Sequence, residues 1–436
     1  MTEPVSPAVT DEASQPRVGT MRKILSTIIH DFGPGLVTGA ADDDPSGIAT
    51  YAQGGVQFGT GLLWTLVLTY PLMSVVQLIS ARIGRVTGHG LATNMMRIFR
   101  TEIAMGLVGL LFIANTINIG ADLAAMGSSA ALVVGLPAHM LTIGFAAISL
   151  LLQVFVPYHS YARFLKWLTL ALLSYIALLF TVRLDWGSIA TGLLLPHVSS
   201  RTALVTIVAI FGTTISPYLF FWQSAQEVEE IADHPGEKPL REQREAAAPE
   251  FARMRIDTWS GMALSNIVAI AIMIGTAATL HAAGKTSIET AADAAQALEP
   301  IAGRFSFLLF SLGVIGTGLL AVPVLAGSTA YAVAELRGWR SSLGSRFHDA
   351  EGFYAIIIVA TSLGVAIDWS PLDPIRALFW SAVLNGIIAV PLLVAIMILA
   401  VNPRVMGGFS IGPATRVTGW LTTVVMALAV GAMFIL

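Results

Sequence analysis

The chain has 436 residues, of which 55% are hydrophobic and only 12% are charged, and its formal net charge is −3. A soluble domain carries about 25% charged residues, so the composition excludes an ordinary soluble protein, and the charge gives no sign of a nucleic-acid partner. The absence of cysteine excludes disulfides and thiolate metal sites.

Residues 1–23 are polar, mix Asp, Glu, Pro and Arg, and lack the apolar core of a signal peptide, so we predict a short N-terminal tail. Beyond it, apolar runs of about 20 residues recur along the chain, which predicts an all-α integral membrane protein. We expect eleven transmembrane spans, at 34–57, 61–84, 102–130, 136–156, 163–183, 203–227, 258–282, 304–334, 353–369, 374–400 and 415–436.

The basic residues set the orientation of these spans. With the N-terminal tail in the cytoplasm, 19 of the 24 Lys and Arg residues fall on the cytoplasmic side and 5 on the opposite side. This bias is what the positive-inside rule requires. The polar segment 228–257 then lies in the cytoplasm as a solvated loop. We expect a protein of the bacterial inner membrane.

The first span contains three consecutive acids in "GAADDDPSGIAT", residues 39–50. One charged residue at the bilayer centre costs about 2.5–3.5 kcal/mol, so Asp42, Asp43 and Asp44 must line a polar cavity rather than face lipid. Pro45 and Gly47 then break the helix, and a broken backbone at membrane depth is tolerated only inside protein or next to water. The alternative is a helix cap at an unusually deep loop.

A second break is predicted in the sixth span, where Pro217 is flanked by Thr213, Thr214, Ser216 and Tyr218. A single proline kink is usually structural. Interrupted helices at matching positions of two halves, however, indicate a transporter site near the midplane. The loose helix ends expose carbonyl groups, and carbonyls together with carboxylates are cation ligands.

The spacing of the two breaks also predicts the domain organisation. Spans one and six are five spans apart, and a repeat of five spans inverts its topology in the membrane. We therefore expect a first five-helix repeat over 24–183, a second over 184–400, and an appended eleventh helix over 401–436.

At these residues the sequence resembles the Nramp family of divalent-metal transporters, which implies a LeuT-type fold. The resemblance is carried by "DPSGIATYAQGGVQFGTGLLW" from Asp44, "NIGADLAAMG" at 118–127 and "LAGSTAYAVAELRGW" at 325–339. The family's Met-Pro-His pattern in the sixth span aligns with Ser216, Pro217 and Tyr218.

The resemblance implies a metal site. It assigns the carboxylate to Asp44 and backbone carbonyl ligands to Ala41 and Thr213, with Gly47 in place of an asparagine and Ser216 in place of a methionine. Oxygen ligands suit Mg²⁺, Ca²⁺ and Mn²⁺ better than softer metals, and Mg²⁺ keeps several waters. The site is similar to that of the Nramp-related magnesium transporters, so we favour Mg²⁺ as the transported ion and place Mn²⁺ second.

The resemblance also bears on proton coupling. The His, the Glu and the Arg pair of proton-coupled members read here as Tyr218, Ala125 and the pair at 351–352, while Asp122 keeps the family's Asp. Tyrosine, with a reference pKa near 10, is a poor proton shuttle at neutral pH. We therefore expect alternating-access transport down the gradient without proton coupling.

Several residues near the breaks are open to two interpretations. Asp42 and Asp43 either attract cations and hold water near the site or cap the second half-helix. Asp122 is expected to be a hydrogen-bonding partner within the helix bundle rather than a ligand. Thr214 is a candidate pathway residue, and Asn385 faces either the site or a neighbouring helix.

The acids at the cytoplasmic end of span six are expected to form a solvated helix end. The alternative is that Glu227, Glu229 and Glu230 line an exit vestibule.

Other functions remain as alternatives. A transporter of the same fold could carry an organic solute, and a metal sensor could bind the ion without transporting it. An intramembrane aspartyl protease is disfavoured because "NIGADL" lacks a Gly-x-Gly-Asp pattern, so we expect no enzyme and no resident cofactor. The expected partners are the transported divalent cation and the lipid bilayer, and a monomer is sufficient.

Overall fold

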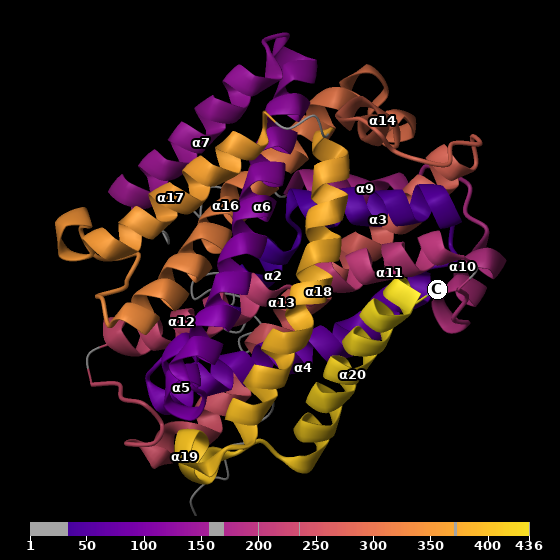
Figure 1. Cartoon of the computed structure of the whole chain (residues 1–436). Coiled ribbons are helices and arrows are strands. Elements are labelled where there is room, and N and C mark those ends of the chain that lie inside the picture. Colours follow the sequence, from indigo (N-terminus) through magenta and orange to yellow (C-terminus); the bar gives the residue numbers. More distant parts are fainter. Residues whose placement is uncertain (1–33, 157–169, 199, 235, 370–372, 436) are drawn as a thin grey trace, which may run out of the picture. The chain divides into compact units, whose positions relative to one another are not determined.

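The computed structural model describes residues 34–156, 170–198, 200–234, 236–369 and 373–435, and within these ranges all regular structure is helical (Figure 1). The predicted tail 1–23 lies outside the described residues. So do the first residues of the expected fifth span, 163–183. The count of eleven spans therefore stays a prediction.

Both predicted helix breaks are present. The first span consists of α2 (Pro34–Asp42) and α3 (Pro45–Phe58), and the sixth consists of α11 (Arg201–Thr214) and α12 (Pro217–Asp233). A proline opens the second half of each span, at a position where the missing N–H costs no helical hydrogen bond. The local sequence thus ends one helix and starts the next in both places.

The other helices are mostly long and apolar. Among the residues that the structure describes, eight stretches, including the α11–α12 pair, are long and apolar enough to cross a membrane, and α17 is a shorter apolar helix. The α-helices are α4 (Leu63–Thr87), α5 (Leu91–Ile98), α6 (Thr101–Val134), α7 (Ala138–Phe155), α9 (Leu173–Leu178), α10 (Trp186–Leu194), α13 (Ala247–Thr276), α14 (Ala291–Gln296), α15 (Glu299–Ala302), α16 (Ser306–Arg337), α17 (Glu351–Ile367), α18 (Pro374–Val401), α19 (Pro403–Met406) and α20 (Pro413–Ile435). Short 3₁₀ or π turns are η1 (Leu170–Leu172), η2 (Arg244–Ala246), η3 (Ala277–His281), η4 (Gly303–Phe305), η5 (Phe347–Asp349) and η6 (Gly407–Phe409).

The polar loop predicted over 228–257 is shorter than expected. Helix α12 continues to Asp233, and α13 already begins at Ala247. The charged residues that indicated a solvated loop instead extend the two helices, because they pair with one another across the helix interface.

The broken helices lie inside a frame of long helices. Helix α2 packs on α13, α3 packs on α13 and α18, α11 packs on α18, and α12 packs on α4 and α16 (Figure 1). The α2–α13 contact is close, since a Cβ atom added at Gly39 would lie only 2.3 Å from the Gly261 carbonyl oxygen. Glycine at this position therefore lets the first half-helix lie directly against α13.

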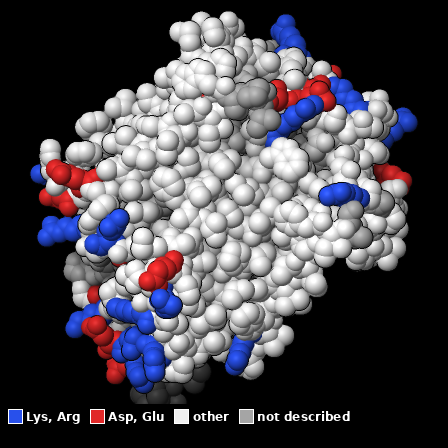
Figure 2. Space-filling model, viewed as in Figure 1, with Lys and Arg blue, Asp and Glu red and all other residues white. Residues whose placement is uncertain are grey.

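One face of the molecule has a broad area without charged side chains (Figure 2). Figure 2 shows charged side chains gathered toward opposite edges of the face in view, with a broad uncharged area between them. Large exposed apolar side chains include Met140 and Leu151 on α7 and Leu428 on α20. A contiguous surface of this kind is rare on soluble monomers and suits contact with lipid.

Candidate cation site

Asp44 is the centre of the first helix break and is almost fully buried. Its Oδ1 accepts hydrogen bonds from the Ser46 hydroxyl and the Gly47 backbone N–H, both at 2.7 Å, and so caps α3. Its Oδ2 lies 3.1 Å from Asn118 Nδ2 and 3.3 Å from the Tyr218 hydroxyl. One oxygen thus orders the half-helix, while the other faces donors on α6 and α12.

The two carbonyl groups expected as ligands lie at the loose ends of α2 and α11. The Ala41 carbonyl oxygen accepts the Tyr218 hydroxyl at 3.1 Å, and the Thr213 carbonyl oxygen accepts the Ser216 hydroxyl at 2.7 Å. A carbonyl oxygen has two lone pairs, so each retains one acceptor position. Both groups are therefore oxygen donors at the ends of broken helices.

Ser216 and Gly47 occupy the positions where the resembled family has its methionine and asparagine. The Ser216 hydroxyl is buried and also lies 2.9 Å from the Gly212 carbonyl oxygen, so it points back to the end of α11. At Gly47 a Cβ atom would lie 3.3 Å from Thr213 Oγ1. Glycine thus brings α3 close to α11.

Asp42 and Asp43 both contact α13 and do not cap α3. The Ser265 hydroxyl lies 2.6 Å from Asp42 Oδ2 and 3.0 Å from Asp43 Oδ1, and all three side chains are buried. Because the N-cap of α3 is Asp44, the capping interpretation of Asp42 and Asp43 is wrong. They instead place two carboxylates beside the break.

The other three candidates differ in their surroundings. Asp122 is buried on α6 next to the backbone N–H of Ser46, so it adjoins the site. The Thr214 hydroxyl donates to the Ile210 carbonyl within its own helix at 2.8 Å. Asn385 is buried on α18, and its amide has no hydrogen-bond partner among the described residues.

Sequence reasoning missed three polar residues that hold this centre. These are Asn118, Ser381 and Ser265. Asn118 Oδ1 accepts the Ser381 hydroxyl at 2.7 Å, and the Ser265 hydroxyl bonds to Asp42 and Asp43. Asn118 stands four residues before Asp122 and so shares its helix face, a signal that could have identified it. Nothing local distinguishes Ser265 or Ser381 from other hydroxyls in apolar helices.

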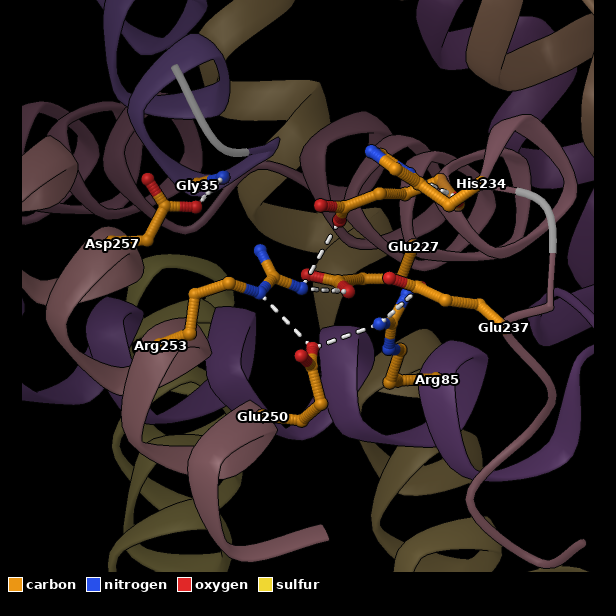
Figure 3. Close-up of polar contacts among 9 residues, drawn as sticks. Gly35, Arg85, Glu227, His234, Glu237, Glu250, Arg253 and Asp257 are labelled. Carbon is orange, nitrogen blue, oxygen red and sulfur yellow. Dashed lines mark hydrogen bonds and ion pairs between the residues drawn. The ribbon is translucent and has the colours of Figure 1, made fainter. Parts of the chain in front are cut away.

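A charged cluster lies where α12 ends and α13 begins (Figure 3). The Arg253 guanidinium contacts Glu227 at 2.9 Å, Glu230 at 3.0 Å and Glu250 at 3.1 Å. The Glu227 side chain is completely buried. The expectation of a solvated helix end is therefore wrong for Glu227, because its charge is compensated by Arg253 inside the protein.

The cluster extends to the neighbouring elements. Arg85 on α4 contacts Glu237 at 2.6 Å and Glu250 at 2.9 Å, and Asp257 on α13 accepts the Gly35 backbone N–H at the start of α2 at 2.6 Å (Figure 3). Charged and polar contacts thus tie the outer ends of both half-helices, α2 and α12, to α13.

One family model and several curated proteins match nearly the whole chain. The family model described as "Nramp: Natural resistance-associated macrophage protein-like" matches residues 35–436. The chain is 26% identical over 408 residues to the divalent metal cation transporter MntH of Klebsiella pneumoniae, with 91% of each chain covered. It is 25% identical over 423 residues to the protein of the same name in Yersinia pestis, covering 94% of this chain and 96% of that one.

Solved structures show the same fold. The manganese transporter of Eremococcus coleocola, solved with an aromatic bis-isothiourea compound, is similar with a TM-score of 0.72 at 18% identity, covering 97% of this chain and 90% of that one. Mhp1, a nucleobase-cation-symport-1 family transporter, is similar with a TM-score of 0.55 at 14% identity, covering 92% and 93%. The predicted all-α, LeuT-type fold is confirmed.

Proposed function

The chain belongs to the Nramp family, and from this premise we propose that it is a secondary transporter that carries a divalent metal cation across the membrane by alternating access. The observation that carries the proposal is the Asp44 carboxylate, buried where the first span is broken. The Ala41 carbonyl oxygen shares the Tyr218 hydroxyl with Asp44, and the Thr213 carbonyl oxygen lies at the end of α11. A buried carboxylate with carbonyl oxygens is a donor set for a hard divalent cation.

We propose Mg²⁺ as the favoured ion. The donors are oxygens, because Ser216 and Gly47 provide neither a thioether nor an amide at their positions. Soft metals gain little from such a set. A cation with few protein ligands keeps part of its water shell, which suits an ion that dehydrates reluctantly.

The second candidate ion is Mn²⁺, carried with proton coupling. The ion is favoured by the structural neighbour, which is called a manganese transporter, and the relatives are called divalent metal cation transporters. Against coupling in this chain, Tyr218 and Ala125 replace titratable groups, and Glu351 at the start of α17 is exposed and acidic instead of basic. We therefore propose transport down the gradient.

The proposed setting is the inner membrane of a bacterium with the N-terminus in the cytoplasm. The excess of basic residues on one side supports that orientation. The spans broken at Pro45 and Pro217 lie one in each predicted repeat, 24–183 and 184–400. All the residues proposed for the site come from one chain, so a monomer suffices.

The test is uptake into proteoliposomes with Mg²⁺, Mn²⁺ and Ca²⁺ measured side by side. Asp44→Ala is expected to abolish uptake. Since alanine also removes the α3 cap, Asp44→Asn serves as the second variant, because asparagine caps helices well but lacks the charge. Uptake at the wild-type rate in folded Asp44→Asn would disprove the proposed site.

A matched control is Asp185→Asn, which changes an exposed N-cap on α10 away from the break. It is expected to transport like wild type. Cation binding without any uptake would favour the sensor alternative, and uptake of an organic solute without metal would favour the solute transporter.

A further inference from the structure

The amide of Asn118 joins the candidate site to a second helix. Asn118 is completely buried on α6. Its Nδ2 donates to Asp44 Oδ2 at 3.1 Å, and its Oδ1 accepts the Ser381 hydroxyl of α18 at 2.7 Å. The nitrogen end of the amide therefore faces the carboxylate, and the oxygen end faces α18.

Ser381 has a second acceptor within reach. Its Oγ also lies 2.7 Å from the Leu378 carbonyl oxygen. A hydroxyl carries one hydrogen and accepts as well as donates. Ser381 can therefore donate either to Asn118 Oδ1 or to Leu378.

This choice lets the amide turn over without losing a hydrogen bond at α18. If Asn118 rotates by a half turn about its last side-chain bond, Ser381 donates to Leu378 and accepts from Asn118 Nδ2. The amide oxygen then faces Asp44 Oδ2. Two oxygens in contact repel each other, so this orientation is unfavourable unless a cation lies between them.

The spacing fits a shared cation. Metal–oxygen distances of 2.0–2.1 Å in an octahedral Mg²⁺ site place neighbouring ligands about 2.9 Å apart. The Asn118 amide end lies 3.1 Å from Asp44 Oδ2. After the half turn, the two oxygens would lie close to the separation of adjacent ligands.

We propose that Asn118 is a cation ligand that turns over on binding: its N–H₂ anchors Asp44 when no cation is present, and its oxygen coordinates the cation when one arrives. The proposal rests on the proposed function, since it needs a divalent cation at Asp44. Asn118 would thus supply from α6 the side-chain amide oxygen that Gly47 on α3 lacks.

The two roles of Asn118 predict opposite effects of Asn118→Leu, which keeps the size of the side chain but removes its polar atoms. A group that only donates to Asp44 competes with the cation, so its removal would leave binding unchanged or tighten it. A ligand contributes to binding, so its removal weakens it. We expect Asn118→Leu to raise the Kd for Mg²⁺ and Mn²⁺ at least tenfold.

Asn118→Asp is the control for misfolding of Asn118→Leu. Aspartate has nearly the same shape and keeps an oxygen facing the site, so divalent binding should stay within threefold of wild type or become tighter. The control is Asn115→Leu on the same helix. Asn115 is equally buried and donates to α16, at 3.1 Å from the Leu325 carbonyl oxygen, and its removal should leave the Kd unchanged.

Titration calorimetry on the purified full-length protein with MgCl₂ and MnCl₂ measures all variants. Wild-type affinity in Asn118→Leu, or loss of binding in Asn118→Asp, would overturn the proposal. Asp44→Asn in the same series separates the two hypotheses. If that variant binds like wild type, the cation site of the proposed function fails; if it loses binding while Asn118→Leu does not, only the role of Asn118 fails.

Discussion

The hydroxyl of Tyr218 lies 3.1 Å from the carbonyl oxygen of Ala41 and thereby ties α12 to the last turn of α2. The same hydroxyl is 3.3 Å from Asp44 Oδ2. It therefore donates to an oxygen that the proposed cation also needs. The hydroxyl has one hydrogen, so while it donates to one of these oxygens, that oxygen has one acceptor position fewer for the cation.

The first prediction follows from that competition. Tyr218→Phe keeps the ring in place but removes the hydroxyl, so the acceptor position that its hydrogen occupies becomes free for the cation. A hydrogen bond contributes about 0.5–1.5 kcal/mol, and we expect the Kd for Mg²⁺ to fall by about two- to tenfold in titration calorimetry. Tyr175→Phe, at a buried tyrosine on α9, is the control. Weaker binding in Tyr218→Phe would mean that the hydroxyl supports the bound ion.

The second prediction concerns ion preference. Ser216 lies at the N-cap of α12 and its hydroxyl bonds to the Thr213 carbonyl oxygen. Ser216→Met removes that bond and adds a thioether, which favours softer metals. We expect the affinity for Mn²⁺ and Cd²⁺ to rise relative to Mg²⁺, measured by calorimetry on both forms. An unchanged ratio would show that position 216 does not face the ion.

The helix breaks and Asp44 could be predicted because local signals define them. Pro45 follows three acids and Pro217 follows a segment rich in Thr and Ser, so each stands where the local sequence already disfavours an unbroken apolar helix, and a carboxylate in an apolar run needs a polar environment. The partners Ser265 and Ser381 could not be predicted, because only the packing of α13 and α18 against the break brings them near.

The loop between α12 and α13 is shorter than the charge pattern predicts for a related reason. Glu227 and Arg253 are 26 positions apart in the chain and each alone suggests a solvated surface. Their compensation is visible only once α12 and α13 lie side by side. Charge content identifies exposed segments reliably only when the charges have no partner across an interface.

The third prediction tests that compensation. Arg253→Ala leaves the buried Glu227 carboxylate without its guanidinium, and breaking a buried ion pair from one side costs about 3–5 kcal/mol. Because the Arg253 side chain is 30% exposed, we expect a loss near the lower end of this range, seen as a lower apparent Tm in fluorescence scanning.

Two variants serve as controls for this loss. Glu227→Gln added to Arg253→Ala should recover part of the stability, since it removes the unpaired charge. Arg100→Ala breaks a pair that is 82% and 74% exposed, and surface pairs contribute little, so its Tm should not change. A double variant no more stable than Arg253→Ala would show that packing, and not charge, accounts for the loss.

The last prediction concerns protons. Coupling needs a group that changes its protonation as the transporter cycles and that connects to one face of the membrane. Tyr218 and Ala125 replace two such groups, while Asp122 beside the Ser46 backbone remains. We expect metal uptake into liposomes to leave the internal pH unchanged and to be insensitive to an inward proton gradient. It should respond to membrane potential, which contributes about 2.3 kcal/mol per elementary charge per 100 mV. A pH-sensitive dye inside the liposomes, with valinomycin setting the potential, measures both effects.

Metal-dependent acidification above the protein-free control would show that coupling persists. Asp122→Asn would then test whether the carboxylate retained on α6 carries the proton. Asp42→Asn and Asp43→Asn are the comparison, because both acids accept from the Ser265 hydroxyl of α13.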